Sequence, residues 1–548
     1  MKSVKIFKTF LAGFILMTMQ QVALAQRDTT KTQSVDITSS YKPVLRNAVK
    51  INFSGTQLTA DTSINISPYR IPSQNLYYAY EPVSLRPLAL EQDTSLDLGL
   101  RRYIKAGFGS YTTPYVKAAW SIGDGKKSLV NISGDYIGSQ GDIEFQDYYR
   151  MHLGAAGSYF SAKNEFYGSV DYAKDQYYLY GYDHAAISYT KDELSQQFQD
   201  ISLHLGLRNT SPVGAGINYN PDVTVNFFTN IDRVSEGTVA FNLPVEKKIG
   251  DALKVMLAAK GSITNYNTKR FIPNNYNLTN NLVQLAPAVE YEVPRLRLHA
   301  GLTPSWNNGV FEWVPEIYAE GQLQEKVFLL QAGWVGSYTP ATYRYLSRLN
   351  PYLAPVTGMY NTKQTEFYGG IKASIAKHFN FGAKVSLISY KDLPLFVNAP
   401  GDEKSFFISK ESSINNFRIH GNLSYISGEK FNITGGLTLN GYTGMQDNAK
   451  AWHTIPMEFT SSLRWQPVEK LLIKGDILLL NGGNYRTATG GALALTGATD
   501  LSGGAEYKIN NQFSIWLNAN NILNDKYERW HNYPVYGLNV LGGIIIRF

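Results

Sequence analysis

The chain has 548 residues, no cysteine, a formal net charge of +7 and an aromatic content of 13%. The lack of cysteine excludes disulfides, thiolate metal sites and a lipid anchor on an N-terminal cysteine. Three positive charges lie in the first 25 residues, and the rest of the chain is mildly basic without clusters of Lys and Arg, which argues against nucleic acid as a partner.

Residues 1–25 have the pattern of a secretory signal peptide. Three lysines precede an apolar run over residues 9–19, and Ala23-Leu24-Ala25 forms a small-residue cleavage site. No later stretch is apolar for about 18 residues, so the sequence predicts no transmembrane helix. A membrane location must therefore depend on β-strands.

Residues 26–100 differ in composition from the rest of the chain. Thr, Ser and Asp dominate, and prolines interrupt any regular pattern. We predict a separate N-terminal extension here, periplasmic or inside a lumen, that is either a reduced plug or a linker.

Residues 101–548 alternate between apolar and polar positions over long runs, as in residues 201–208, 417–425 and 431–440. The runs reach about 10 to 14 residues, long enough to cross a bilayer at a tilt, and tight connections alternate with longer ones, one of them expected at about 392–413. The sequence thus predicts an all-β fold: a transmembrane antiparallel β-barrel of about 22 strands. Its turns would be periplasmic and short, its extracellular loops longer, and both termini periplasmic.

The last strand carries this pattern to the C-terminus. One face is apolar and the other holds Asn539 and Arg547, as expected between lipid and a hydrated lumen. The terminal aromatic residue resembles the signal read by barrel-assembly machinery, which makes outer-membrane lipid and that machinery the expected partners. The residues of the apolar face are Leu538, Val540, Ile544, Ile546 and Phe548, of which Ile544, Ile546 and Phe548 form the assembly signal.

Residues 517–527, followed by Trp530, Tyr533, Pro534 and Gly537, resemble the C-terminal end of the TonB-dependent receptors, and the Tyr- and Asn-rich style resembles barrels of the Bacteroidota. The resemblance implies uptake of a solute too large for porins, with TonB as a partner. Residues 26–100 are shorter than the plug domain of that family. The segment that resembles the box that engages TonB consists of Ser34, Val35, Asp36, Ile37 and Thr38.

A barrel of this width needs a filling, because an open lumen would breach the permeability barrier. Three fillings remain open: residues 26–100 folded inward, external loops folded in, or a partner protein. We favour the first, because residues 41–53 have enough apolar content to dock.

The lumen-facing positions hold charges of both signs that roughly cancel, which indicates a hydrated wall of paired charges rather than a selective pore. His152, His204, His299 and His420 also face inward. They lie far apart around the barrel, with no carboxylate at ligand spacing, so we predict neither a metal site nor any cofactor. No nucleophile, base and acid gather at one rim, so we predict no enzyme.

External loops place aromatic and cationic side chains next to each other, as recognition of a sugar face or an anionic siderophore would require. The alternative is that these side chains, including the tyrosines of residues 177–182, form the aromatic girdle or pack the loops. The candidate ligand contacts are Tyr343, Arg344, Tyr345, Arg348, Tyr527, Trp530 and His531.

Two functions follow from this sequence. The first is a barrel like the TonB-dependent receptors that takes up a solute. The alternative is a non-transporting scaffold or subunit barrel of an outer-membrane complex with other envelope proteins, and a passive porin would need an open lumen.

Overall fold

The computed structural model describes residues 102–123, 126–211, 216–230, 233–268, 275–323, 328–375, 378–428 and 430–548. The predicted signal peptide, the extension over residues 26–100 and the segment from Ser34 to Thr38 that resembles a TonB box lie outside these residues. The first described strand begins at Arg102.

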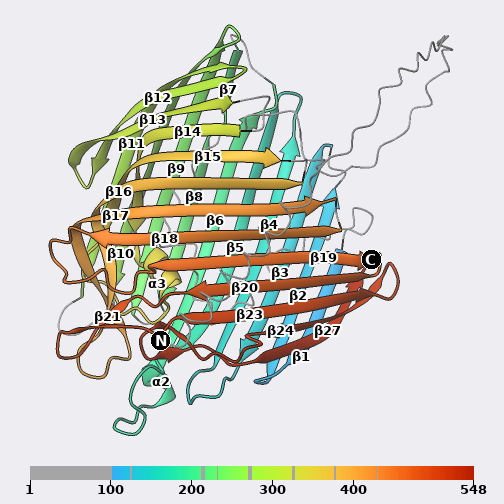
Figure 1. Ribbon diagram of the computed structural model, residues 1–548, viewed down its shortest axis with the longest axis vertical. Coiled ribbons are helices and arrows are strands. Elements are labelled where there is room, and N and C mark those ends of the chain that lie inside the picture. The colour runs from blue at the N-terminus through green and yellow to red at the C-terminus, as the bar shows by residue number, and fades with distance from the viewer. Residues whose placement is uncertain are drawn as a thin grey trace, which may run out of the picture. The chain divides into compact units, whose positions relative to one another are not determined.

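Twenty-three strands form one antiparallel sheet, and the pairing of the first strand with the last closes it into a ring. Figure 1 shows the first strands, in blue, beside the last, in red. The strands are β1 (Arg102–Gly109), β2 (Thr113–Gly123), β3 (Ser128–Ser139), β4 (Tyr148–Phe160), β5 (Asn164–Tyr178), β6 (Ser195–Asn209), β7 (Ile217–Tyr219), β8 (Asp222–Asn230), β9 (Val234–Ile249), β10 (Leu253–Thr268), β11 (Asn277–Val293), β12 (Leu296–Asn307), β13 (Val310–Leu323), β14 (Phe328–Ala341), β15 (Tyr360–Ile375), β16 (Phe379–Asn398), β17 (Phe406–Ser427), β18 (Phe431–Thr443), β19 (Met457–Val468), β20 (Leu471–Leu480), β23 (Ala498–Lys508), β24 (Phe513–Asn520) and β27 (Asn539–Arg547).

Strands β7 and β8 occupy one position in this ring. Both pair with β9 in the same register, and the pairing is interrupted at Asn220 and Pro221, where proline lacks the N–H that a ladder requires. The ring therefore has 22 strand positions, which confirms the predicted barrel.

The remaining elements lie in the connections. They are the helices α2 (Lys191–Leu194) and α3 (Tyr343–Leu349), the hairpin of β21 (Asn484–Arg486) with β22 (Ala492–Ala494), and the hairpin of β25 (Glu528–Trp530) with β26 (Tyr533–Pro534). Neither described helix is long and apolar enough to cross a membrane.

The two faces of the wall have opposite character, because successive side chains of a strand point to opposite faces of the sheet. In β11 the outward residues Val283, Leu285 and Val289 are exposed, whereas the inward residues Gln284 and Glu290 are buried. The closing strand repeats this arrangement with Ile544 exposed and Arg547 buried. An apolar exterior around a polar interior is the pattern of a barrel that stands in lipid.

Several inward charges pair with each other, as the sequence predicts. Glu290 accepts from Lys254 at 2.9 Å and from Arg297 at 2.7 Å, and Lys384 lies 2.7 Å from Glu366. These side chains come from neighbouring strands, since β10 pairs with β11 and β11 with β12. The wall is lined by paired charges rather than by rings of one sign.

The two ends of the barrel differ in the length of their connections. At one end, the turn end, the chain reverses within a few residues, at 161–163, 250–252, 294–295, 469–470 and 509–512. At the other, the loop end, the longer connections are 140–147, 179–194, 342–359, 444–456, 481–497 and 521–538. This confirms the predicted alternation of short turns with longer loops.

The long loop predicted at 392–413 is wrong. Strands β16 and β17 run through most of it and leave only residues 399–405 between them. Phe396 packs on one side of this hairpin, and Leu395 and Val397 pack on the other against Trp452. Because both faces are covered, the alternation that marks a half-buried strand is lost there.

Candidate functional site

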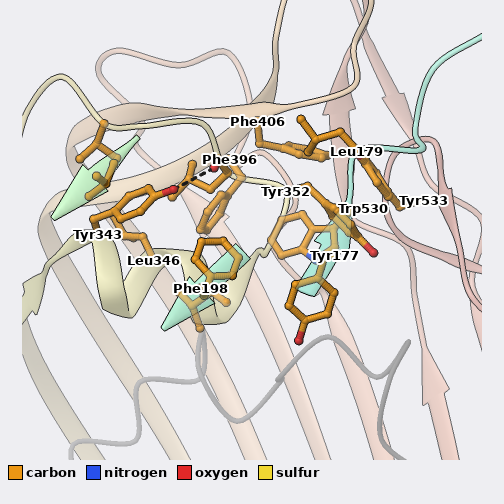
Figure 2. Packing of buried hydrophobic residues seen from close by; sticks show 14 of the residues in the cluster. Tyr177, Leu179, Phe198, Tyr343, Leu346, Tyr352, Phe396, Phe406, Trp530 and Tyr533 are labelled. Atoms are coloured by element: carbon orange, nitrogen blue, oxygen red, sulfur yellow. Dashed lines mark hydrogen bonds between the residues drawn. The ribbon is translucent and has the colours of Figure 1, made fainter. Parts of the chain in front are cut away.

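Side chains from the loop end gather into one large buried cluster, which we call the lid cluster (Figure 2). Its members come from connections and strand ends on several sides of the ring, so the connections fold inward over the mouth of the barrel. The buried members are Tyr148, Tyr177, Leu179, Tyr180, Tyr182, Leu194, Phe198, Phe228, Val234, Tyr266, Ala341, Tyr343, Leu346, Leu349, Tyr352, Leu353, Val356, Phe396, Phe406, Trp530 and Tyr533.

Three tyrosines meet within the lid cluster. The rings of Tyr352 and Tyr533 stack at 3.5 Å, and Tyr180 packs edge-on against them at 5.8 and 4.8 Å. Their connections leave the ring at β14/β15, β24/β27 and β5/β6, and six, four and six barrel strands separate these pairs. Contact between such widely spaced connections requires that they cross the mouth.

Burial raises the pKa of Tyr180 to about 12 and that of Tyr352 and Tyr533 well above the ordinary value. All three phenols are therefore neutral at physiological pH. The Tyr180 hydroxyl donates to the carbonyl of Pro534 at 3.0 Å, and the Tyr533 hydroxyl donates to the carbonyl of Lys404. The first bond joins the connections 179–194 and 521–538, and the second ties a fourth connection, residues 399–405, to 521–538.

Helix α3 is fixed to the wall by carboxylates. Glu236 of β9 accepts from the backbone N–H groups of Tyr343 and Arg344 at 2.7 and 3.3 Å, where the first turn of a helix has unpaired donors. Asp200 of β6 pairs with Arg344 at 2.7 Å and also with Arg348. The helix is therefore held from two strands on the same side of the barrel.

The connection 444–456 covers the β16–β17 hairpin. Buried His453 hydrogen-bonds through Nδ1 to the carbonyl of Phe396 at 2.8 Å, and Arg529 donates to the His453 carbonyl at 2.8 Å. Burial lowers the pKa of His453 to about 3, so the imidazole is neutral. Because the carbonyl can only accept, Nδ1 carries the proton.

A pocket of about 450 Å³ opens among the connections beside the lid cluster. Its exposed lining residues Asp183, His184 and Gly401 connect it with the outside. The lining residues are Ile143, Tyr180, Tyr182, Asp183, His184, Ile187, Gly401, Asp402, Glu403, Glu528, Asn532 and Pro534. We call this the lid pocket, and its volume lies in the usual range of small-molecule sites.

The predicted ligand contacts are only partly brought together. Tyr343 and Trp530 are buried in the lid cluster, while Tyr527 is buried in a separate cluster with Leu478 and Val535. Arg344, Tyr345 and Arg348 belong to α3, and His531 stacks on Tyr485 at 3.7 Å. None of the seven lines the lid pocket. Tyr177, Tyr180 and Tyr182 are buried in the lid cluster, as the alternative of loop packing predicts, and Tyr180 and Tyr182 also line the lid pocket.

Sequence reasoning missed the lid pocket, since its lining comes from four separate connections. The sequence does show acidic residues within predicted loops, but only the fold shows that they converge on one pocket. These residues are Asp183, Asp402, Glu403 and Glu528.

Carboxylates do lie next to three lumen histidines, contrary to the expectation. His152 lies between Asp135 and Asp171 at 3.6 and 3.4 Å. His204 lies 3.6 Å from Asp222, and His299 lies 3.6 Å from Glu290 and Glu316. Within the part of the chain that the structure describes, no group of three or more such residues could hold a metal ion. The two nitrogens of one imidazole point apart, so its flanking carboxylates do not converge on one point.

No family model and no curated protein matches this sequence. Solved structures match it over 82% of its length at low identity. The FrpB iron transporter from Neisseria meningitidis has a TM-score of 0.65, with 11% identity and 81% of that chain covered. The pyoverdine outer membrane receptor FpvA from Pseudomonas aeruginosa PAO1 has a TM-score of 0.61, with 10% identity over 78% of its chain.

The copper transporter OprC has a TM-score of 0.60, with 12% identity and 82% of its chain covered. The first and third of these proteins are transporters and the second is a receptor. The shared feature is the closed barrel, not the sequence. This chain has the barrel fold of the TonB-dependent receptors, as the resemblance of its C-terminal end implies.

Proposed function

We propose that this protein is an outer-membrane transporter barrel that admits a solute through its loop end. The loop end would face outward and both termini would lie in the periplasm. The lid pocket carries this proposal, because it is a solute-sized cavity built into the connections that cover the mouth. The likeness to iron and copper transporters supports it.

The proposed mechanism is displacement of the lid. The connections that line the lid pocket also carry Tyr180 and Tyr533, so a ligand that changes their arrangement also disturbs the tyrosine contacts across the mouth. A solute released past the lid would meet the wall of paired charges. Residues 34–38 would link this movement to TonB, as the resemblance implies.

An introduced disulfide tests this mechanism, because the chain has no cysteine of its own. Leu353 and Phe406 form an isolated parallel β-bridge between the 342–359 connection and β17, so these two backbones lie side by side. Cells that carry Leu353→Cys with Phe406→Cys should lose growth on one limiting solute when oxidised and regain it on reduction. The matched control, Arg486→Cys with Ala492→Cys, bridges one hairpin and should leave growth unchanged.

The scaffold function is favoured by one observation. The β21–β22 hairpin at the loop end exposes all of Ala492–Ala494, with Leu493 54% exposed. Stoichiometric recovery of another envelope protein with the solubilised barrel, lost on Leu493→Asp, would support a scaffold. If, in addition, cells that lack the barrel grew as well as wild-type cells on every limiting solute tested, the transport proposal would be wrong.

A further inference from the structure

We infer that the lid pocket selects a small organic cation that carries an apolar or ring-shaped part. As a statement about uptake the inference rests on the proposed function, because it names the class of solute that the loop end admits. As a statement about binding it depends only on the chemistry of the pocket.

The charge of the lining is the first argument. Four of the residues that line the lid pocket are acidic, namely Asp183, Asp402, Glu403 and Glu528, and its described lining includes neither Lys nor Arg. Asp402 is neutralised by its neighbour. Burial opposes ionisation of this carboxyl, but hydrogen bonds from Lys404 and Tyr189 hold its pKa below the usual range. Among the described residues no Lys or Arg pairs with the other three, although Glu403 and Glu528 lie 3.8 and 3.5 Å from the two ring nitrogens of His531. The lining therefore keeps an excess of carboxylates, which disfavours an anionic ligand.

The cations nearby are engaged elsewhere. Lys404 lies over the ring of Tyr189 at 4.1 Å as well as pairing with Asp402. Lys191 pairs with Asp147 at 2.7 Å, and Lys526 with Asp142 at 3.2 Å. Each of these lysines thus has a carboxylate partner outside the three that remain.

The other lining residues supply the apolar surface. Ile143, Ile187 and Pro534 are aliphatic, and Tyr180 and Tyr182 present aromatic surface. Tyr182 is kept in place by His184, which stacks on it at 4.1 Å. An ammonium group gains from carboxylates and from aromatic faces alike, and its apolar part gains from the remaining wall. A purely polar cation such as a metal ion would leave that wall unused.

Three ligands with the same ring and different charge test the inference: benzylammonium, benzyl alcohol and benzoate. Binding to the full-length barrel in detergent is followed by saturation-transfer NMR. Benzylammonium should bind most tightly and benzoate least. Asp183→Asn and Glu403→Gln should each weaken benzylammonium binding roughly tenfold, the effect of losing one charge-assisted contact.

Asp192→Asn is the matched control, because Asp192 lies in the same connection as Asp183 but outside the pocket. It should leave binding unchanged, and the heat-dependent gel shift shows that each variant is folded. The inference is wrong if benzoate binds as well as benzylammonium, if D192N weakens binding as much as D183N, or if none of the three ligands binds at millimolar concentration.

The proposed ligand binding and the proposed transport can be refuted independently of each other. If benzylammonium binds with the expected charge dependence but enters oxidised and reduced cells of the Leu353/Phe406 cysteine variant equally fast, the pocket assignment stands and transport through the lid is refuted.

Discussion

Two aromatic stacks in this barrel look alike and have different origins. Trp334 and Phe367 stack at 5.4 Å on the outer wall, where both are exposed, and their strands place them opposite each other. Tyr352 and Tyr533 stack at 3.5 Å in the lid cluster, where both are buried, although they are far apart in the chain. The first contact follows from local strand register, whereas the second exists only when the barrel is closed.

The wall and the lid should therefore respond differently to mutation. The wall is held by a closed backbone ladder, in which every N–H and C=O must be paired in lipid. The lid cluster is held by burial of aromatic and aliphatic side chains away from water. A change in the lid should open the mouth and leave the barrel intact.

Tyr533→Ala should have the largest effect on the lid. It removes the ring that contacts both Tyr180 and Tyr352, together with the bond to the Lys404 carbonyl. Truncation of a buried aromatic side chain costs about 3–5 kcal/mol. We expect a rise in planar-bilayer conductance, with the heat-dependent gel shift of the barrel unchanged.

Trp334→Ala is the matched control, because it breaks the stack on the outer wall. It should leave the conductance at the wild-type level. Equal conductance in Tyr533→Ala and wild type would show that the lid cluster is not what closes the barrel to ions.

Most of the wall could be predicted from sequence, and the lid could not. Runs such as residues 431–440 show period-two alternation, which is a local property of one strand in a half-buried sheet. The β16–β17 extension was missed because both of its faces are buried. The aromatic residues of 177–182 were visible in sequence, but their partners at 352 and 533 depend on which connections cross the mouth.

Glu290→Gln should have the next largest effect, and it should destabilise the barrel wall rather than the lid. This carboxylate pairs with Lys254, Arg297 and His299, and Glu290 is only 2% exposed. Removing one member of a buried charge group leaves the others uncompensated and costs about 3 kcal/mol. The temperature at which the folded gel band is lost should fall, while conductance stays low.

Glu469→Gln, at an exposed turn, should change neither quantity and serves as the control for the loss of a charge. A conductance increase in Glu290→Gln would contradict the separation of wall from lid.

Acid should open the lid through His453. Its pKa is about 3 in the closed lid and about 6.5 when solvated, so between these pH values only the open state binds the proton. The contribution to stability is complete above pH 6.5 and falls by roughly 2 kcal/mol at pH 5. Conductance measured from pH 7.5 to 4.5 should rise with acidification, and His453→Gln should flatten the curve. His378→Gln, at the turn end, should leave the curve as in wild type.

Arg348→Ala should have the smallest effect on the lid. Asp200 keeps its bond to Arg344, and the Arg348 side chain is 52% exposed, so the pair contributes less than about 1 kcal/mol. Conductance should match wild type, whereas Arg344→Ala should raise it measurably, because the Arg344 side chain is only 22% exposed and bonds the buried Asp200 at 2.7 Å. Because Arg348→Ala should leave the lid intact, this substitution can test whether Arg348, one of the predicted ligand contacts, binds a solute. If Arg348→Ala lowered uptake of a solute at unchanged conductance, α3 would present a contact for that solute as well as a seal.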